Sequence, residues 1–231
     1  PELAASADIV LANSTRFAAE LQPYNPHTYP IETGVNLELY NPAKKYETPG
    51  DMQDIPRPII GYMGTINSTR LDGELLYQII SQRPDYSFVF TGPEDDIFRR
   101  NRIHSLKNAY FTGQKKVDEL PAYIAAYDVC INPQMVNEIT DGNYPLKIDE
   151  YLAMGKPTVA TSTHTMRNIF AGYTHLATSP QEWLSAIDHA ITESDDKKLA
   201  QQRISFAETH SWGHSVKKIY RIIEHFNNRI L

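Results

Sequence analysis

The sequence is poor in cysteine, with Cys130 as the single thiol among 231 residues. An intramolecular disulfide is therefore excluded, a cysteine-based zinc site has too few ligands, and a reducing compartment, the cytoplasm, is expected. The sequence also lacks any apolar run near the roughly 20 residues that a membrane-spanning helix needs. Its longest apolar runs, such as residues 59–63, have the length of strands.

An excess of positive charge is absent as well. Lys and Arg number 22 against 28 Asp and Glu, which gives a net charge of -6 and a pI near 5.7. This balance argues against nucleic acid or an anionic membrane as the main partner. With 41% hydrophobic and 22% charged residues, the composition is that of a globular chain long enough to fold without metals or disulfides.

Short apolar runs alternate with amphipathic stretches from residue 58 onward. The runs predict strands over residues 58–63, 87–91, 109–112, 128–132, 157–161 and, more weakly, 175–177. The stretches between them predict helices over residues 73–82, 119–126, 146–154 and 181–193. This alternation is typical of parallel βαβ units, so the expected fold class is α/β, a doubly wound parallel sheet. Residues 196–231 are predicted to be helical, with one apolar stripe made of Val216, Ile219, Ile222, Ile223 and Phe226.

Residues 1–57 follow a different pattern. Residues 8–12 predict a strand, and Ser14 is placed to cap a short helix over residues 15–21. Residues 22–57 hold six of the fifteen prolines, which disfavours helix and central strand and predicts an extended surface linker. One strand and one helix do not make a domain. We therefore expect residues 1–57 to be the remnant of a preceding domain plus a linker, and residues 58–231 to form the second domain with the C-terminal helices. The start at Pro1, without a methionine or a signal pattern, also suggests part of a longer protein.

A doubly wound sheet binds its ligand beyond the carboxyl ends of the strands, where the strand order reverses. In the common strand order the crevice lies between the first and fourth strands, which directs attention to residues 64–71 and 133–145. Gly64 follows a strand directly and allows the backbone to approach a ligand closely. The first loop has neither the G-x-G-x-x-G nor the Walker pattern. A plain tight turn and a phosphate-facing loop are both compatible with it.

The second loop leads into a helix that carries two charged residues. Pro145 is placed as the first helical residue and Gly155 as the C-terminal cap. Lys147 and Glu150 are three residues apart and share one helix face. The helix N-terminus and Lys147 suit a diphosphate, while Glu150 suits a pair of sugar hydroxyls. A surface ion pair is the alternative interpretation.

Several segments resemble the retaining family-four group of GT-B glycosyltransferases. The most specific is L-K-I-D-E-Y-L-A-M-G-K-P-T-V-A at residues 146–160, supported by residues 59–64, 88–93, 110–113 and 119–133. Residues 7–14 and 33–36 resemble the exit from that family's N-terminal domain. The resemblance covers nearly the whole chain. It implies a nucleotide-sugar-binding Rossmann-like domain, normally preceded by an acceptor-binding domain, with a final helix that reaches back across the interface.

The resemblance also implies roles for individual residues. The implied donor-binding set is Gly64, Thr65, Gly92, Gly113, Gln114, Asn143, Pro145, Lys147 and Glu150. Within it, Lys147 binds phosphate, Glu150 binds the ribose hydroxyls, and the backbone at Gly113 and Gln114 contacts the base. Lys147 and Arg70 are the implied catalytic cations.

The sequence departs from the family pattern in two places. Gly142, with Asp141 beside it, stands where the family often has an acidic residue that contacts the transferred sugar. Leu71 and Asp72 follow Arg70 in place of the usual lysine-glycine.

The expected function is transfer of a sugar from a UDP- or GDP-linked donor to an acceptor hydroxyl, in polysaccharide or cell-envelope glycan synthesis. No metal and no cofactor are expected in this chemistry. The expected partners are the donor and an N-terminal acceptor domain, through which the protein would associate peripherally with the inner face of the membrane. The chain alone is expected to bind donor without transferring sugar. A sugar-nucleotide epimerase of the same fold and a non-catalytic nucleotide-binding module are the alternatives.

Overall fold

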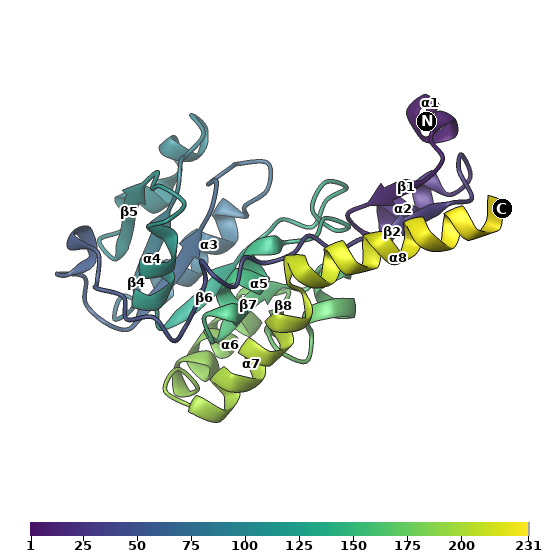
Figure 1. The fold of residues 1–231 in the computed structure, drawn as a ribbon. Helices are drawn as coiled ribbons and strands as arrows, with labels where there is room; N and C mark the ends of the chain where they lie inside the picture. Colours follow the sequence, from purple (N-terminus) through teal and green to yellow (C-terminus); the bar gives the residue numbers. More distant parts are fainter. Residues whose placement is uncertain (231) are drawn as a thin grey trace.

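The computed structural model describes residues 1–230, with side chains through residue 228, and its centre is a six-stranded parallel sheet. The strands are β3 (Ile59–Met63), β4 (Ser87–Thr91), β5 (Ala109–Gly113), β6 (Val129–Asn132), β7 (Thr158–Thr161) and β8 (His175–Ala177). Their order is β5-β4-β3-β6-β7-β8 (Figure 1). The order reverses between β3 and β6, so the predicted doubly wound sheet is confirmed, with every strand boundary within one residue of its prediction.

Helices cover both faces of this sheet. α3 (Gly73–Gln82) and α6 (Pro180–Thr192) pack on one face, and α4 (Leu120–Ala126) and α5 (Leu146–Ala153) on the other. Side chains of β3 alternate between the two cores, with Ile60 and Tyr62 on the α3 side and Ile59 and Met63 on the α5 side. This alternation follows from the two-residue period of a strand and explains why a sheet buried on both faces reads as a continuous apolar run.

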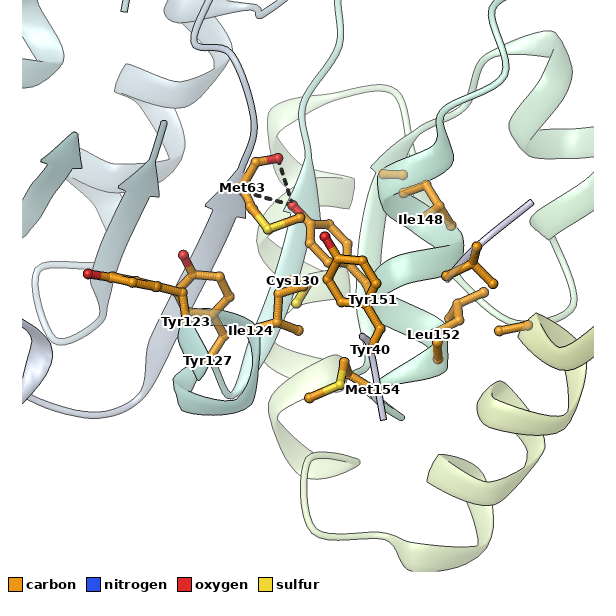
Figure 2. Close-up of a cluster of buried hydrophobic side chains, with 14 of the residues drawn as sticks. Tyr40, Met63, Tyr123, Ile124, Tyr127, Cys130, Ile148, Tyr151, Leu152 and Met154 are labelled. Atoms are coloured by element: carbon orange, nitrogen blue, oxygen red, sulfur yellow. Dashed lines mark hydrogen bonds between the residues drawn. The ribbon is translucent and has the colours of Figure 1, made fainter. Parts of the chain in front are cut away.

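The core on the α5 side is rich in tyrosine. Tyr123, Tyr127 and Tyr151 are buried there together with Cys130 (Figure 2). The Tyr151 hydroxyl accepts a hydrogen bond of 2.8 Å from the Met63 backbone N–H, drawn dashed in Figure 2, and thereby fixes α5 to the carboxyl end of β3. Burial raises the pKa of the Cys130 thiol, so this cysteine is an inert core residue.

Local signals fix the ends of several helices. Asp72 caps α3 by accepting from Leu75 N–H at 2.9 Å, and Ser179 with Glu182 forms a capping box at α6. Gly155, which has a φ of +72°, follows the end of α5, as predicted. Pro145 was predicted as the first helical residue, but the helix begins at Leu146 and Pro145 is the residue before it, with ψ at 79° outside the helical range.

The first thirty residues form a small unit with its own two-stranded parallel sheet. It consists of α1 (Glu2–Ser6), β1 (Val10–Ala12), α2 (Thr15–Leu21) and β2 (Thr28–Pro30). Ser14 caps α2 by accepting from Phe17 N–H at 3.1 Å, as predicted. The prediction of linker throughout residues 22–57 was wrong at β2. A proline fits there because Pro30 is the last residue of a strand paired on one side only.

The remainder of that segment packs against the large sheet and its helices, so it is not only a surface linker. Val35, Tyr40 and Met52 are buried in the core on the α5 side, and a 3₁₀ turn spans Gly50–Met52. Further 3₁₀ turns span Phe98–Arg100 and Arg102–Ser105, and a π-helical turn spans Met166–Phe170. The proline count correctly excluded regular elements over most of the segment, but apolar side chains between the prolines still reach the core.

The C-terminal tail is two helices, in agreement with the C-terminal helices predicted over residues 196–231. α7 (Lys197–Thr209) ends and α8 (Trp212–Ile230) begins where Val35 N–H donates to the His210 carbonyl at 2.9 Å. α8, yellow in Figure 1, extends from α7 back to the N-terminal unit, where Phe226 lies edge-on to His27 at 4.9 Å between ring centroids. The predicted stripe is split: Ile219, Ile222 and Phe226 are half-buried, whereas Val216 and Ile223 are exposed. Among the helices of residues 1–230, none combines the length and apolarity required to cross a membrane.

Candidate functional site

A cleft of about 520 Å³ opens at the carboxyl end of β3, where the strand order reverses. The loops after β3 and β6 form its two sides and are joined by a 2.8 Å hydrogen bond from Met135 N–H to the Arg70 carbonyl. The lining residues are Tyr62, Gly64, Thr65, Asn67, Arg70, Gln134, Asn143, Tyr144, Pro145, Leu146 and Lys147. The cleft therefore lies at the position that the strand order and the two loops predict.

Lys147, in the first turn of α5, is the cation on one side of this cleft. Its Nζ donates to the Tyr62 hydroxyl at 2.6 Å and lies 4.0 Å from the centroid of that ring. Burial lowers the pKa of Lys147 to about 7, Glu150 acts in the opposite direction, and the positive charge of Arg70 lowers it further. Burial is the largest cause of this lowered pKa, and an anionic ligand beside Lys147 would offset the cost of charging it.

Glycines bring the backbone of neighbouring strands close together at this edge of the sheet. A glycine with a positive φ lies at the carboxyl end of each of three strands. Gly64 follows β3, Gly92 follows β4, and Gly113 is the last residue of β5. A Cβ on Gly92 would lie 2.0 Å from the Gly64 carbonyl oxygen, and one on Gly64 would lie 2.8 Å from Lys147 Nζ. The positive φ of Gly64 favours glycine there, and the missing side chain leaves room for the ammonium group of Lys147.

Glu150 lies one turn further along α5 and is not among the residues that line the cleft. Burial raises the pKa of Glu150 to about 6, while the hydroxyl of Tyr40 and the charge of Lys147 lower it. Lys147 and Glu150 are thus close enough to interact, and the carboxylate lies beside a buried tyrosine of residues 31–57. Its role toward ribose stays a prediction.

The remaining predicted donor-binding residues divide into two groups. Thr65, Arg70, Asn143 and Pro145 line the cleft with Gly64 and Lys147, whereas Gly92, Gly113 and Gln114 do not. Gly92 and Gly113 are nevertheless joined to the cleft edge, because Gly64 N–H donates to Thr91 and Gly92 N–H donates to Gly113. Gly113 and Gln114 are exposed at the end of β5, which is separated from β6 by two strands, β4 and β3, in the order of the sheet.

The position where the family pattern has an acidic residue faces the N-terminal unit. A Cβ on Gly142 would lie 2.3 Å from Arg16 Cδ of α2. The neighbouring Asp141 accepts a 2.8 Å hydrogen bond from His164 N–H, so its carboxylate is engaged by the loop after β7. The departure from the pattern at Gly142 therefore coincides with close packing of α2 on this loop.

Sequence reasoning did not name five of the lining residues. Asn67, Gln134 and Tyr144 lie in the two loops that it assigned to the crevice, whereas Tyr62 and Leu146 lie outside them. Tyr62 is the most consequential, because its hydroxyl donates to the Thr65 carbonyl at 3.0 Å while it accepts from Lys147. Its place in a strand buried on both faces concealed this contact. The available signal was its position two residues before Gly64, at the strand end that borders the cleft.

Comparison with known proteins identifies the family. Residues 57–193 match the family model described as glycosyl transferases group 1, which is more than half of the chain. The chain belongs to this family. The chain is also 26% identical over 197 residues to the putative teichuronic acid biosynthesis glycosyltransferase TuaH of Bacillus subtilis (strain 168). The match covers 83% of the chain and 49% of TuaH, so the chain spans about half the length of this curated relative.

Solved structures show the same fold at low sequence identity. Anabaena Alr3699/HepE in complex with UDP matches with a TM-score of 0.76 at 16% identity, over 95% of the chain and 64% of that protein. A glycosyltransferase from Rickettsia africae ESF-5 matches with a TM-score of 0.76 at 18% identity, over 94% of the chain and 63% of that protein. The glycosyl transferases group 1 assignment confirms the family resemblance, and these neighbours confirm the Rossmann-like fold.

Proposed function

We propose that this chain is the donor-binding half of a glycosyltransferase that transfers a sugar from a UDP- or GDP-linked donor to an acceptor hydroxyl. The observation that carries the proposal is the cleft at the strand-order reversal, where Lys147 and Arg70 lie with the N-terminus of α5. The family match and the relative named for teichuronic acid biosynthesis favour transfer in cell-envelope glycan synthesis over the epimerase and docking-module alternatives.

In the proposed reaction, the bond between the anomeric carbon and the diphosphate oxygen breaks, a bond to the acceptor oxygen forms, and the acceptor hydroxyl gives up its proton to the departing diphosphate or to solvent. Negative charge then develops on the departing diphosphate. Lys147 and Arg70 would stabilise this charge together with the amide N–H groups at the start of α5. Glu150 would accept from the ribose hydroxyls, and the backbone at Gly113 and Gln114 would contact the base. We propose that this step uses no metal ion.

Preorganisation of Lys147 supports this role, because the Tyr62 hydroxyl holds its ammonium group. The backbone of Arg70 is fixed as well, since its carbonyl accepts from Met135 N–H and joins the two loops. Donor binding would therefore bring negative charge to an ammonium that is already positioned, and little binding free energy would be lost in ordering that group.

Calorimetric titration of the chain with UDP, GDP, a nucleotide sugar and NAD tests the proposal. Loss of one charge-assisted contact costs about 1.5–3 kcal/mol, so Lys147→Met and Arg70→Met are each expected to weaken nucleoside diphosphate binding by about one to two decades. Lys197→Met is the matched control, because Lys197 is exposed at the start of α7. Binding by both cleft variants at the affinity of the parent would refute the assignment.

The acceptor side of the reaction is proposed to depend on an N-terminal domain, in the cytoplasm at the inner face of the membrane. The chain alone is therefore expected to bind donor and to transfer no sugar. Measurable turnover of a nucleotide sugar by the purified chain would contradict this part of the proposal.

A further inference from the structure

A cluster of three metal-ligating side chains lies at the edge of the sheet opposite the donor cleft. His175 is the first residue of β8, and His189 and Glu193 lie one turn apart at the end of α6. Because β8 is parallel to the other strands, its first residue lies at the amino edge of the sheet, whereas the cleft lies at the carboxyl edge. The cluster is therefore separate from the proposed donor chemistry.

The spacing of these groups matches the dimensions of a four-coordinate metal site. His175 Nε2 lies 3.1 Å from Glu193 Oε2, and His189 Nε2 lies 3.2 Å from Glu193 Oε1. One ligand atom from each residue can be chosen so that all lie within 4.8 Å of one another. Metal–ligand bonds of about 2.0–2.1 Å in a tetrahedron place ligand atoms roughly 3.4 Å apart. The two histidines contact different oxygens of Glu193, so the groups must move closer together to share one ion, and the exposed His189 can adjust by rotating its side chain.

The surroundings of the cluster hold the carboxylate in place and supply space for a further ligand. The buried Arg203 of α7 forms an ion pair with Glu193 through Oε2, which orients the carboxylate. The negative charge of Asp196 also acts on this guanidinium. A cavity of about 210 Å³, lined in part by His175, Glu193 and Arg203, adjoins the cluster and has room for water.

We propose that His175, His189 and Glu193 bind a divalent transition-metal ion, zinc in the first place, which joins the end of α6 to the start of β8. Two imidazoles and one carboxylate are a donor set typical of zinc, and water from the adjoining cavity would complete the coordination. Arg203 places a positive charge beside the ion, so the expected affinity is moderate. The ion would stabilise this edge of the sheet and would not take part in sugar transfer.

Zinc titration of the chain, purified without a histidine tag, tests the proposal. Calorimetry is expected to show one equivalent of Zn²⁺ bound, with a rise in the thermal unfolding midpoint as Zn²⁺ is added. Visible bands of four-coordinate Co²⁺ should appear when Co²⁺ is used in its place. His175→Ala and His189→Ala should each weaken Zn²⁺ binding by about tenfold or more. His189 is mostly exposed, so its variant should fold like the parent.

His104→Ala is the matched control. His104 also pairs with a glutamate, Glu94, at 2.8 Å, but it is not part of the cluster of three. Its variant should bind Zn²⁺ like the parent, and UDP affinity should be unchanged in all three variants. The proposal is overturned if the parent binds no stoichiometric Zn²⁺, which would leave the cluster as an ion-pair network. It is also overturned if the His175 and His189 variants bind Zn²⁺ as tightly as the parent.

Discussion

The affinity of the cleft for a nucleoside diphosphate should depend on pH through Lys147. Burial and the neighbouring Arg70 lower the pKa of this ammonium to about 7 in the free chain, although Glu150 opposes them. A bound diphosphate places negative charge beside Lys147 and raises its pKa again. Binding above neutral pH is therefore expected to take up a proton, and affinity should fall as pH rises above the pKa of the free chain.

The size of this effect follows from the lowered pKa. With a pKa of about 7, the ammonium is about half populated at neutral pH and about one per cent populated two pH units higher. Protonating Lys147 at that higher pH costs about 2.7 kcal/mol, at 1.36 kcal/mol per unit. UDP affinity should therefore fall roughly twentyfold between about pH 7.5 and pH 9, a range above the phosphate titration near pH 6.

Calorimetry in buffers with different ionisation enthalpies measures the proton uptake directly. Lys147→Arg is the matched variant, because a guanidinium stays charged over this range. Its UDP binding should show neither proton uptake nor the fall in affinity, even if the changed shape weakens binding overall. A parent chain whose UDP affinity is constant from about pH 7.5 to pH 9, with no proton uptake, would refute the reasoning that an ammonium of lowered pKa binds the diphosphate.

Two further predictions concern the scaffold around the cleft. Tyr151→Phe removes the hydroxyl that accepts from Met63 N–H at 2.8 Å and leaves a buried donor unpaired. It should lower the free energy of unfolding in urea by about 1–3 kcal/mol, and an unchanged midpoint would contradict this. Gly92→Ala places a Cβ 2.0 Å from the Gly64 carbonyl oxygen at a φ of +146°. It should cost at least about 1–3 kcal/mol, whereas Gly50→Ala, which meets nothing within 4 Å, should leave the unfolding curve unchanged.

The sheet was predictable because its signals are local. Each strand from β3 to β8 is a short apolar run with glycine, proline or polar residues near its ends, and the predicted boundaries fall within one residue of the observed ones. The helix caps at Ser14 and Gly155 are equally local and were also confirmed. Strand order followed from the commonest doubly wound arrangement, a property of βαβ chains in general.

Residues 31–57, which connect the N-terminal unit to the large sheet, were predicted poorly because their contacts are distant in sequence. Tyr40 packs against the core of α5, more than a hundred residues away, and Val35 exchanges backbone hydrogen bonds with the turn between α7 and α8. Periodicity within the segment cannot reveal either contact. Proline density indicates the absence of regular structure, but it says nothing about burial of the side chains between the prolines.

The sequence predicted where the candidate site lies in the fold, but not how its side chains contact one another. Sequence spacing placed Lys147 near the start of a helix beside the loop after β3, where the cleft lies. It could not show that Tyr62 holds the ammonium or that Glu150 lies beside Tyr40. These contacts depend on how β3 and residues 31–57 pack against α5, which is a matter of tertiary structure.

Contacts along α5 explain why its cation can be positioned before any ligand binds. Lys147 is held by Tyr62 of β3, Asp149 accepts from His210 Nδ1 at 3.0 Å, and Tyr151 accepts from Met63 N–H. The turn between α7 and α8 and the carboxyl end of β3 therefore fix this helix from two sides. A helix held in this way keeps its N-terminal N–H groups and its ammonium group at one edge of the cleft. Stabilisation of a departing diphosphate then requires little reorganisation, which is the condition under which electrostatic catalysis is most effective.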